Sequence, residues 1–550
     1  MRFALAIIND VLIAAAAVVV VFVVLFGGGV MFAGAFRLSI RSPDNPIVIF
    51  SLLWAIRFLI RDWAPWFGVP RWPTSALWNR CQDILSSASS WSRSVRASQG
   101  RRTILVIAVL SLGLKCWFAL VSPGFFSGDD VEIHEMSLGS LLHQPWAVWD
   151  LRSPVFPLGF IYPPQWMAYH LGLRDTGHLV VAGRLWVALL STLSVYLVWK
   201  VSSRLWPGDG GYAVLATALF ATGKLAIAFG SSELPRPVST VFVLLGFLRL
   251  LDGRASSVAM SGAALGLASA FRFSEAVFVA AAALQLSLQR RFLQVGLFFI
   301  VAITTLLVLI AVPDQYYWGE MFHSVRAAID FTLVKQLSSR GYQPAWWYVV
   351  SIGQWTTLGV AGLALVGSVG NWRPFVWAIV PLLALSALPH KEARYAIPMM
   401  PFVSLLAAAG IRWTSDQARN RRSWMGPAVM SALAIGLVHD SSHYRLPRSN
   451  GEVEFARHVS AVMRPPALAA EQLWRLGGHL YLTSEILIDL DPESLQDPNY
   501  LATKLVPDAW VALDGRRGHR SGPEGVLMQR GYRVVERDGS GYVLWRPARD

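Results

Sequence analysis

Long apolar runs, repeated along most of the chain, constrain the fold more than any other feature. The clearest of them, LIAAAAVVVVFVVLFGGGVMFAGAF, begins at Leu12. It reaches the length of about 20 residues that an α-helix needs to cross the hydrocarbon core of a bilayer. It is too long for a removable signal peptide and has no suitable cleavage site, so we interpret it as a retained span. Hydrophobic residues make up 54% of the 550 residues and charged residues 15%, which excludes an ordinary soluble protein.

Charged residues punctuate these runs and predict an all-α polytopic membrane protein with about 13 transmembrane helices. The expected spans are 8–35, 46–62, 103–121, 178–199, 211–230, 237–250, 258–272, 275–289, 292–312, 346–368, 374–388, 395–411 and 424–439.

Basic residues predict the orientation of the spans. Segment 63–102 is rich in arginine and poor in acid, so the positive-inside rule puts it in the cytoplasm. Alternation then puts the other basic connections, such as Arg290 with Arg291, on the same side. The net charge of +14 therefore reflects cytoplasmic loops beside anionic lipid, and we do not expect nucleic acid as a partner.

The chain is expected to form three parts. Residues 1–102 hold N-terminal spans and the basic loop, and 103–440 form a transmembrane module with extracytoplasmic loops at 122–177 and 313–345. Residues 441–550 lose the apolar runs and predict a small soluble α/β domain, also extracytoplasmic. We expect a helix at GEVEFARHVSAVM, strands at HLYLT and AWVALD, and a hairpin at YRVVERDGSGYVLWRP. A specificity or scaffolding role is the default expectation for this domain.

Cysteine and histidine usage argues against a metal centre. The chain has two cysteines, Cys81 and Cys116, which do not make a disulfide framework, and its histidines lack zinc-ligand spacing. We expect neither a metal nor a cofactor. A divalent ion held by carboxylates is possible in principle and is not favoured.

Acidic residues open the loop 122–177. Asp129 and Asp130 follow the end of a span, and Glu135 lies further along in GDDVEIHE. Neighbouring carboxylates at a membrane surface suit general-base chemistry, because burial and nearby charge tune their pKa. The alternative is that SGDD caps the start of a helix. The two interpretations are compatible.

Two further segments carry candidate residues. VWDLRSPVFP contains Trp149, Asp150 and Arg152, and Arg152 either binds a phosphate or pairs with Asp150. The loop 313–345 carries Asp314 and the aromatic residues Tyr316, Tyr317 and Tyr342. Such aromatic residues either form an interfacial belt or stack against sugars.

The stretch PHKEARY lies between two apolar runs. His390, Lys391 and Arg394 are either anchors at the membrane interface or the cationic wall of an anion-binding site. If a helix starts there, Lys391 and Arg394 are three residues apart and share a face.

Together these motifs resemble a known family. GDDVEIHE, VWDLRSPVFP, PDQYYWGEMF, SSRGYQPAWWY and HKEARY follow one another over about residues 103–412. In this order they resemble the lipid-phosphate-mannose-dependent mannosyltransferases of N-glycan and GPI-anchor assembly. These enzymes form glycosyltransferase family twenty-two of the GT-C superfamily. Gly128, Asp130 and Tyr395 depart from the proline, glutamate and phenylalanine of the family, which fits a distant, bacterial member.

The resemblance implies a GT-C fold and inverting transfer of a sugar, with mannose favoured, from a polyprenyl-phosphate donor. The acceptor is a hydroxyl of a lipid-linked glycan or glycolipid, and the site faces the periplasm or exterior, or the endoplasmic reticulum lumen in a eukaryote. Asp129 is the expected base, with Asp130 as its substitute or orienting partner. The expected donor-phosphate residues are His390, Lys391, Arg394, Arg152 and Arg272. The expected substrate-binding residues are Glu135, Trp149, Asp150, Asp314, Tyr316, Tyr317 and Tyr342.

Other functions compete with this one. A GT-C transferase for another lipid-linked sugar, such as arabinose, aminoarabinose or glucose, would carry the same motifs. A transporter or flippase for lipid-linked sugars would place ionisable residues at mid-membrane. A scaffold would tolerate neutral replacement of Asp129 and Asp130.

Overall fold

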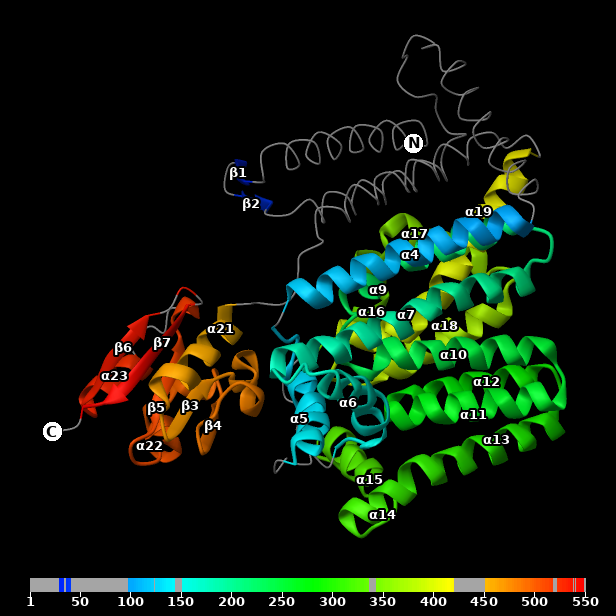
Figure 1. Cartoon of the computed structure of the whole chain (residues 1–550). Coiled ribbons are helices and arrows are strands. Elements are labelled where there is room, and N and C mark those ends of the chain that lie inside the picture. Colours follow the sequence, from blue (N-terminus) through cyan, green and yellow to red (C-terminus); the bar gives the residue numbers. More distant parts are fainter. Residues whose placement is uncertain are drawn as a thin grey trace.

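A computed structural model gives the fold of the chain (Figure 1). It describes residues 29–33, 36–40, 97–122, 124–143, 151–335, 343–419, 451–517, 522–537, 539 and 541–548. The spans expected at 46–62 and 424–439 lie outside the described residues, as do Trp149, Asp150 and Tyr342.

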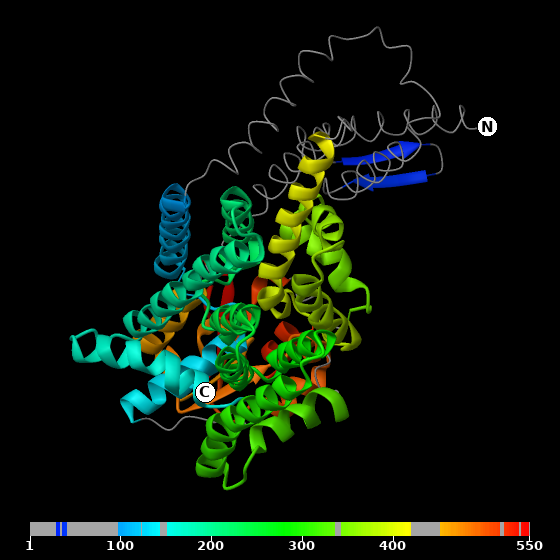
Figure 2. The same cartoon turned by 90° about the vertical axis from the view of Figure 1, so that its right-hand side faces the viewer.

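Helices make up the larger part of the molecule. The bundle consists of α4 (Ala97–Val121), α7 (Thr176–Leu205), α8 (Gly210–Ala221), α9 (Lys224–Ala228), α10 (Pro235–Asp252), α11 (Ala255–Phe271), η3 (Phe273–Glu275), α12 (Ala276–Leu288), α13 (Phe292–Leu306), η4 (Leu307–Ala311), α14 (Val312–Trp318), α16 (Trp347–Thr356), α17 (Leu358–Ser368), α18 (Trp372–Ala387), η6 (Ala393–Met399) and α19 (Met400–Arg419). The connections between them add α5 (Gly128–Leu142), η2 (Pro157–Ile161), α6 (Tyr162–His170), α15 (His323–Ile329) and η5 (Asp330–Val334). Figure 2 shows these helices side by side, with the small C-terminal domain behind them.

Membrane-spanning helices are present in this bundle. Within the described part, those long and apolar enough to cross a bilayer are Gly100–Val121, Thr176–Leu205, Phe292–Trp318 and Ala393–Trp413. Shorter apolar helices, such as Ala255–Phe271 and Trp372–Ala387, pack among them. The protein is therefore a multi-pass membrane protein, and the prediction of an all-α polytopic fold is confirmed.

Several expected spans are interrupted. The span expected at 211–230 divides at Thr222 and Gly223 into α8 and α9, and that expected at 346–368 bends by 115° between α16 and α17. Thr357, at the bend, has a φ of 88°, which a continuous helix does not allow. At the N-terminus, Gly29–Ala33 pairs as an antiparallel strand with Phe36–Ile40, so one helix over 8–35 is wrong. The reason is the GGG run at 27–29, whose residues are poor helix formers.

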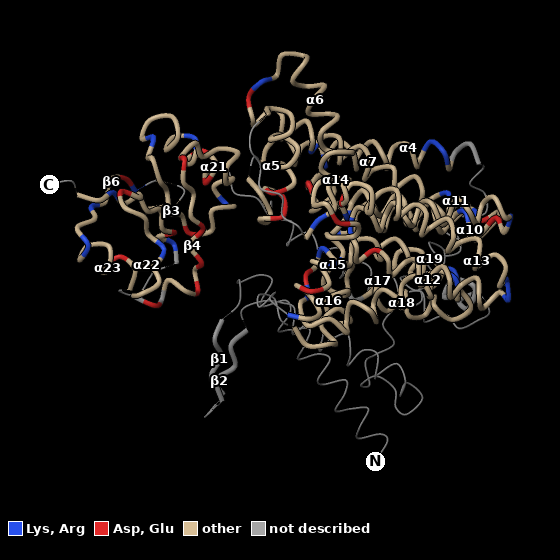
Figure 3. The backbone as a smooth tube through the Cα atoms, turned by 90° about the horizontal axis from the view of Figure 1, so that it is seen from below, with Lys and Arg blue, Asp and Glu red and all other residues tan. Residues whose placement is uncertain are grey.

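An aromatic cluster fills the middle of the bundle. The ring of Trp377 lies 5.0 Å from that of Phe247 and 5.4 Å from that of Phe402. Its indole N–H donates to Gln285 Oε1 at 2.8 Å, which satisfies the buried polar atom. Charged residues gather instead at the two ends of the bundle (Figure 3). The end where α5 begins carries acidic and basic residues side by side, as a polar site requires.

The C-terminal domain is a mixed five-stranded sheet with helices on both faces. The strands are β3 (Ala467–Glu471), β4 (Ile486–Leu490), β5 (Trp510–Asp514), β6 (Tyr532–Arg537) and β7 (Tyr542–Pro547), in the order β4-β3-β5-β7-β6. Strand β3 is parallel to β4 and β5, whereas β7 is antiparallel to β5 and β6. One face packs on α21 (Gly451–His458) with η7 (Val459–Met463), and the other on α22 (Pro498–Lys504) and α23 (Pro523–Gln529). The predicted α/β domain is thus confirmed.

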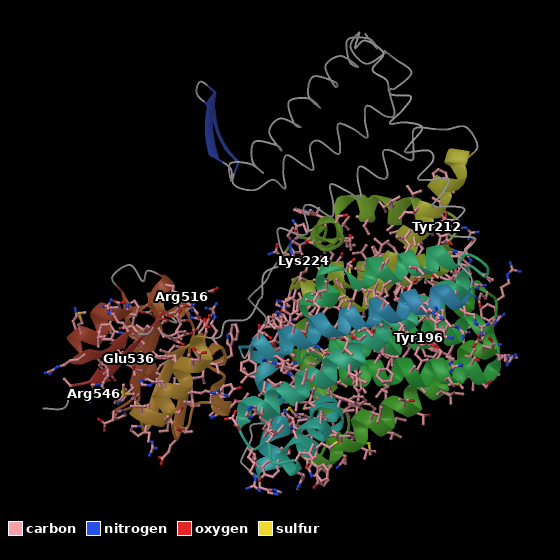
Figure 4. The ribbon with its side chains drawn as sticks, turned by 45° about the horizontal axis from the view of Figure 1, so that its top comes forward. Tyr196, Tyr212, Lys224, Arg516, Glu536 and Arg546 are labelled. Carbon is pink, nitrogen blue, oxygen red and sulfur yellow. The ribbon has the colours of Figure 1, made fainter. Side chains whose placement is uncertain are left out.

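Within this domain, the outcome differs between segments. The helix at GEVEFARHVSAVM, the strand at AWVALD and the hairpin are present. The strand expected at HLYLT is wrong. The segment begins within the turn η9 (Gly478–Leu480), because Gly477 and Gly478, directly before it, have positive φ. Figure 4 shows Arg516, Glu536 and Arg546 on this domain, and Tyr196, Tyr212 and Lys224 on the helical bundle beside it.

Candidate active site

Helix α5 presents the acidic residues of the first loop. Ser127 is its N-cap in an extended conformation, and Asp129 and Asp130 lie in the first turn, as the sequence predicts. Negative side chains are favourable there, because the helix dipole and the free N–H groups of the first turn carry positive charge. The capping interpretation and the site interpretation are therefore compatible, and the two aspartates differ in what they contact.

Asp129 is held between two arginines from distant segments. Arg152 Nη2 lies 2.5 Å from Asp129 Oδ1, and Arg394 Nη1 lies 2.9 Å from Oδ2. Arg394 also donates to Ser127 Oγ at 2.9 Å. The structure thus brings together position 129, the segment after residue 150 and the motif at 390–394.

Glu132 joins the same site and was not among the predicted residues. It lies one turn after Asp129 on α5, and its Oε2 accepts a hydrogen bond from Arg152 Nε at 2.9 Å. Arg152 therefore bridges two carboxylates through its Nε and Nη2 atoms, which suits the fixed donor directions of its planar fork. The i, i+3 spacing in DDVE was the signal in the sequence that could have identified Glu132.

These carboxylates differ in their pKa. Burial alone would raise the pKa of Asp129, but Arg152, Arg394, Arg272 and Arg236 outweigh it and hold the pKa far below its usual range. For Glu132, burial dominates over the attraction of Arg152 and raises the pKa to about 7. Asp129 is thus a carboxylate at every physiological pH, whereas Glu132 changes its charge near neutrality.

The motif at 390–394 divides into two roles. Arg394 turns toward Asp129 and also pairs with Glu392, which in turn accepts from His390 Nε2 at 2.8 Å. Burial would raise the pKa of Glu392, but the hydrogen bond from His390 and the charge of Arg394 lower it to about 2. Lys391 instead donates to the backbone carbonyls of Gln343, at 3.1 Å, and Leu388.

The helix at this motif begins at Ala393, two residues before the expected span 395–411 but after Lys391. It follows the N-cap Glu392 as a 3-10 turn that contains Pro398. Lys391 and Arg394 therefore do not share a helix face. The side chain of Lys391 ties the segment before α16 to the end of α18, and Arg394 reaches the carboxylates.

A second layer of cations surrounds this cluster. Arg236, at the start of α10, is 1% exposed and lies 4.1 Å from the ring centre of Tyr395 and 3.7 Å from Glu275 Oε1. Its Nε and Nη1 atoms have no hydrogen-bond acceptor among the described residues. Arg272 is half-buried, and desolvation together with the charges of Arg236 and Arg152 lowers its pKa to about 10. This layer can accept further negative charge.

A cleft opens beside the two layers. It is lined by Arg152, Ser153 and Arg272 together with apolar groups, and its empty volume is about 290 Å³ with open solvent included. The apolar part of the lining is Ile133, Leu151, Phe156, Pro157, Pro235, Phe271 and Phe273. A wall of this kind suits a ligand with a charged group and an apolar portion.

A buried polar network supports α5 from the bundle side. Arg184, from α7, pairs with Glu233 and donates to the carbonyls of Ser122 at 2.5 Å and Gly124 at 2.7 Å. Glu233 lies 3.1 Å from His134 Nε2, and His134 Nδ1 lies 2.8 Å from Gln165 Nε2. Arg184 and Glu233 are completely buried, so this pair fixes the segment that leads from α4 into α5.

The remaining predicted residues lie elsewhere. Asp130 is buried and accepts a hydrogen bond from the N–H of Phe126 at 2.8 Å, which stabilises the turn before α5. Glu135 contacts the C-terminal domain. Asp314 accepts from Ser324 N at 2.9 Å and Oγ at 2.6 Å, which holds the turn between α14 and α15. Tyr316 is 79% exposed and Tyr317 39% exposed, and their rings stand edge to face.

The site offers no arrangement of metal ligands in the described part of the chain. There, no three His, Cys, Asp or Glu side chains come together as a group that could hold an ion. The carboxylates of the cluster are instead engaged by guanidinium groups. Among the described residues, the site therefore combines carboxylates with several arginines.

Solved structures identify the class of the fold. ArnT from Cupriavidus metallidurans in the apo state is 14% identical in sequence, with a TM-score of 0.55, and covers 82% of this chain and 98% of its own. The same protein bound to undecaprenyl phosphate gives a TM-score of 0.54 with the same identity and coverage. The chain thus has the fold of the GT-C membrane glycosyltransferases.

Sequence comparison identifies the family. Residues 130–447 match the Alg9-like mannosyltransferase family. GPI mannosyltransferase 3 of Yarrowia lipolytica (strain CLIB 122 / E 150) is 24% identical over 368 residues, which cover 62% of this chain and 68% of the relative. The chain belongs to the Alg9-like mannosyltransferase family. It is an enzyme, a membrane glycosyltransferase, as the motifs predict.

Proposed function

We propose that the enzyme transfers a sugar, with mannose favoured, from a polyprenyl-phosphate donor to a hydroxyl of a lipid-linked glycan or glycolipid. The observation that carries this proposal is the contact of Asp129 with Arg152 and Arg394 beside a cleft with an apolar wall. It combines a proton acceptor with cations for a phosphate leaving group. The family match and the undecaprenyl phosphate bound to ArnT support the choice of sugar and of donor.

The proposed chemistry is one inverting displacement. The acceptor hydroxyl oxygen attacks the anomeric carbon from the side opposite the phosphate. The bond between that carbon and the phosphate oxygen breaks, and its electron pair leaves with the phosphate. The hydroxyl proton passes to the carboxylate of Asp129. Arginines stabilise the charge that grows on the departing phosphate.

Donor binding prepares the base in this mechanism. Asp129 is a poor proton acceptor while two guanidinium groups hold it, because they lower its pKa. A donor phosphate competes for Arg152 and Arg394, and Arg236 and Arg272 add charge behind them. As the phosphate draws these groups away, the basicity of Asp129 rises. Of the predicted phosphate residues, Arg152, Arg272 and Arg394 take the direct role, and His390 and Lys391 support the segment that carries Arg394.

We also propose the membrane side of the site. The arginine-rich connections, including segment 63–102, favour the cytoplasm, which puts α5 and the C-terminal domain on the outer face. This arrangement corresponds to the periplasmic face of a bacterial inner membrane, or to the endoplasmic reticulum lumen in a eukaryote.

The test is transfer by purified protein offered a small panel of polyprenyl-phosphate sugars: mannose, glucose, arabinose and aminoarabinose. We expect release of the mannose from its lipid phosphate in the presence of an acceptor lipid. If only another sugar of the panel were transferred, that sugar would replace mannose in the proposal. Movement of intact donor across proteoliposomes without cleavage would instead identify a transporter.

Asp129→Asn tests the base. We expect the rate of transfer to fall by about 10²–10⁴-fold, the usual contribution of general-base catalysis. Asp130→Asn is the matched control, since its amide oxygen still accepts from the N–H of Phe126, and we expect it to keep most of the activity. Full turnover by Asp129→Asn would remove Asp129 as the base.

A further inference from the structure

Helix α5 contacts the C-terminal domain on the side that does not face the arginines. Glu135, predicted to bind substrate, points to this domain: its Oε1 accepts a hydrogen bond from the backbone N–H of His479 at 3.0 Å. Residues Gln472–Leu482, which follow strand β3, form the facing surface, here called the docking loop.

Two glycines shape the docking loop where it meets Glu135. Gly477 has a φ of +81° and Gly478 a φ of +52°, both in the left-handed region that other residues rarely adopt. A Cβ atom on Gly478 would lie 2.9 Å from Glu135 Oε1 and 3.1 Å from Val131 Cγ1. The backbone turn therefore fits closely against α5 and aims the N–H of His479 at the carboxylate.

Apolar contacts continue the docking surface along α5. Phe125, Val131 and Leu138 share one buried cluster with Leu476 and Leu482 of the docking loop. At the first turn, the Cβ of an added side chain on Gly128 would lie 3.7 Å from Trp474 Cβ, so the residue before Asp129 rests against the domain. The catalytic turn of α5 is thus in direct contact with the C-terminal domain.

Consecutive residues of α5 are held from opposite sides. His134 joins the buried network of Gln165 and Glu233 in the bundle, and Glu135 joins the docking loop. Together they fix the rotation of α5 about its axis. Asp129 lies about one and a half turns before them, so that rotation decides the direction of its carboxylate.

We propose that the docking loop of the C-terminal domain is a positioning element for the catalytic helix, with Glu135 and Gly478 as its positioning residues. This inference rests on the proposed function, because it requires α5 to carry the base. A displacement of about 1 Å in a reacting group costs on the order of 100-fold in rate. The domain therefore affects the rate of the chemical step, because it sets the orientation of the Asp129 carboxylate.

A matched pair of glycine substitutions tests this role. Gly478→Ala introduces a Cβ atom against α5, whereas Gly531→Ala introduces one in open space at a φ of +78°, directly before the edge strand β6. Both glycines have a positive φ, so each variant bears a backbone cost within the same domain. We expect Gly478→Ala to lower kcat about 10- to 100-fold, with the donor KM changed less than twofold, and Gly531→Ala to retain the kcat of the parent.

Glu135 provides an independent test with a rescue. Glu135→Gln keeps an oxygen that accepts from His479 N–H, so we expect nearly full kcat, whereas Glu135→Ala loses the bond and lowers kcat without raising the donor KM. His479→Ala is the control, since the backbone N–H remains. Hydrogen exchange should become faster for amides of α5 in Glu135→Ala, and stay unchanged in β3 and β5.

The outcomes separate this inference from the proposed function. If Asp129→Asn is inactive while Gly478→Ala and Gly531→Ala have equal kcat, the positioning role is wrong and the base assignment stands. If Asp129→Asn is active, the proposed function fails first. If Glu135→Gln lost as much kcat as Glu135→Ala, positioning through the hydrogen bond to His479 would also be contradicted.

Discussion

At the scale of single residues, Asp129 and Glu132 share Arg152 yet titrate in different ranges. Asp129 contacts two arginines and stays ionised, whereas Glu132 contacts one, and burial raises its pKa to about 7. Below that pH, Glu132 is neutral and leaves Arg152 to Asp129 and the donor phosphate. Above it, Glu132 is negative, attracts Arg152 and repels a phosphate.

A pH dependence of donor binding follows from Glu132. We expect the donor KM to rise as pH increases through about 7, by roughly tenfold between the two limits. Glu132→Gln fixes the neutral form, so its donor KM should stay flat across the same range. Steady-state kinetics at several pH values from about 5.5 to 8.5 would give the donor KM of the parent enzyme and of Glu132→Gln for comparison. A parent profile that is equally flat would contradict the titration of Glu132 near the donor.

At the scale of elements, the entry into α5 depends on a charge pair in the interior of the bundle. Glu233→Gln leaves the guanidinium of Arg184 buried without its carboxylate, which costs about 3–5 kcal/mol in comparable pairs. We expect a lower midpoint of thermal unfolding in detergent. Asp252→Asn is the control: its ion pair with Arg204, at 3.2 Å, is partly exposed, and its loss should cost about 0–1 kcal/mol. Equal midpoints for the two variants would contradict the importance of the buried pair.

The sequence predicted elements better than their ends and breaks. Apolar length located the helices from 103–121 to 395–411, because the bilayer selects for composition over about 20 residues. The break at Thr357 and the start of the helix at Ala393 depend on neighbouring segments, which periodicity does not encode. HLYLT has the composition of a strand, but contact with α5 selects a turn.

For the candidate site, too, the sequence predicted some residues and missed others. Asp129, Arg152 and Arg394 were predicted from motifs and lie together. Glu132 lies within the motif GDDVEIHE but was missed, because its importance arises from its contact with Arg152. Arg236 was missed because it lies outside the motifs. Asp130, Lys391 and Asp314, which the resemblance also implied, contact backbone atoms.

At the scale of the whole molecule, α17 and α19 touch through their backbones. A Cβ atom on Gly367 would lie 1.8 Å from the carbonyl oxygen of Leu406, and one on Gly410 would lie 2.1 Å from that of Leu363. We expect Gly367→Ala to destabilise the protein by about 1–3 kcal/mol, as overpacking does. Gly362→Ala, on the same helix but facing open space, should be neutral. The half-lives of thermal inactivation of Gly367→Ala and Gly362→Ala should be compared. Similar half-lives would contradict the close approach of α17 and α19.

This close approach ties the lipid surroundings to the chemistry. Helix α19 continues η6, which carries Arg394, and α17 follows α16, whose Tyr348 hydroxyl lies 3.2 Å from the carbonyl of Glu392. Two helices locked at their backbones tilt together when the thickness of a bilayer changes. The guanidinium group beside Asp129 is attached to this pair, so we expect acyl-chain length to affect the rate of sugar transfer.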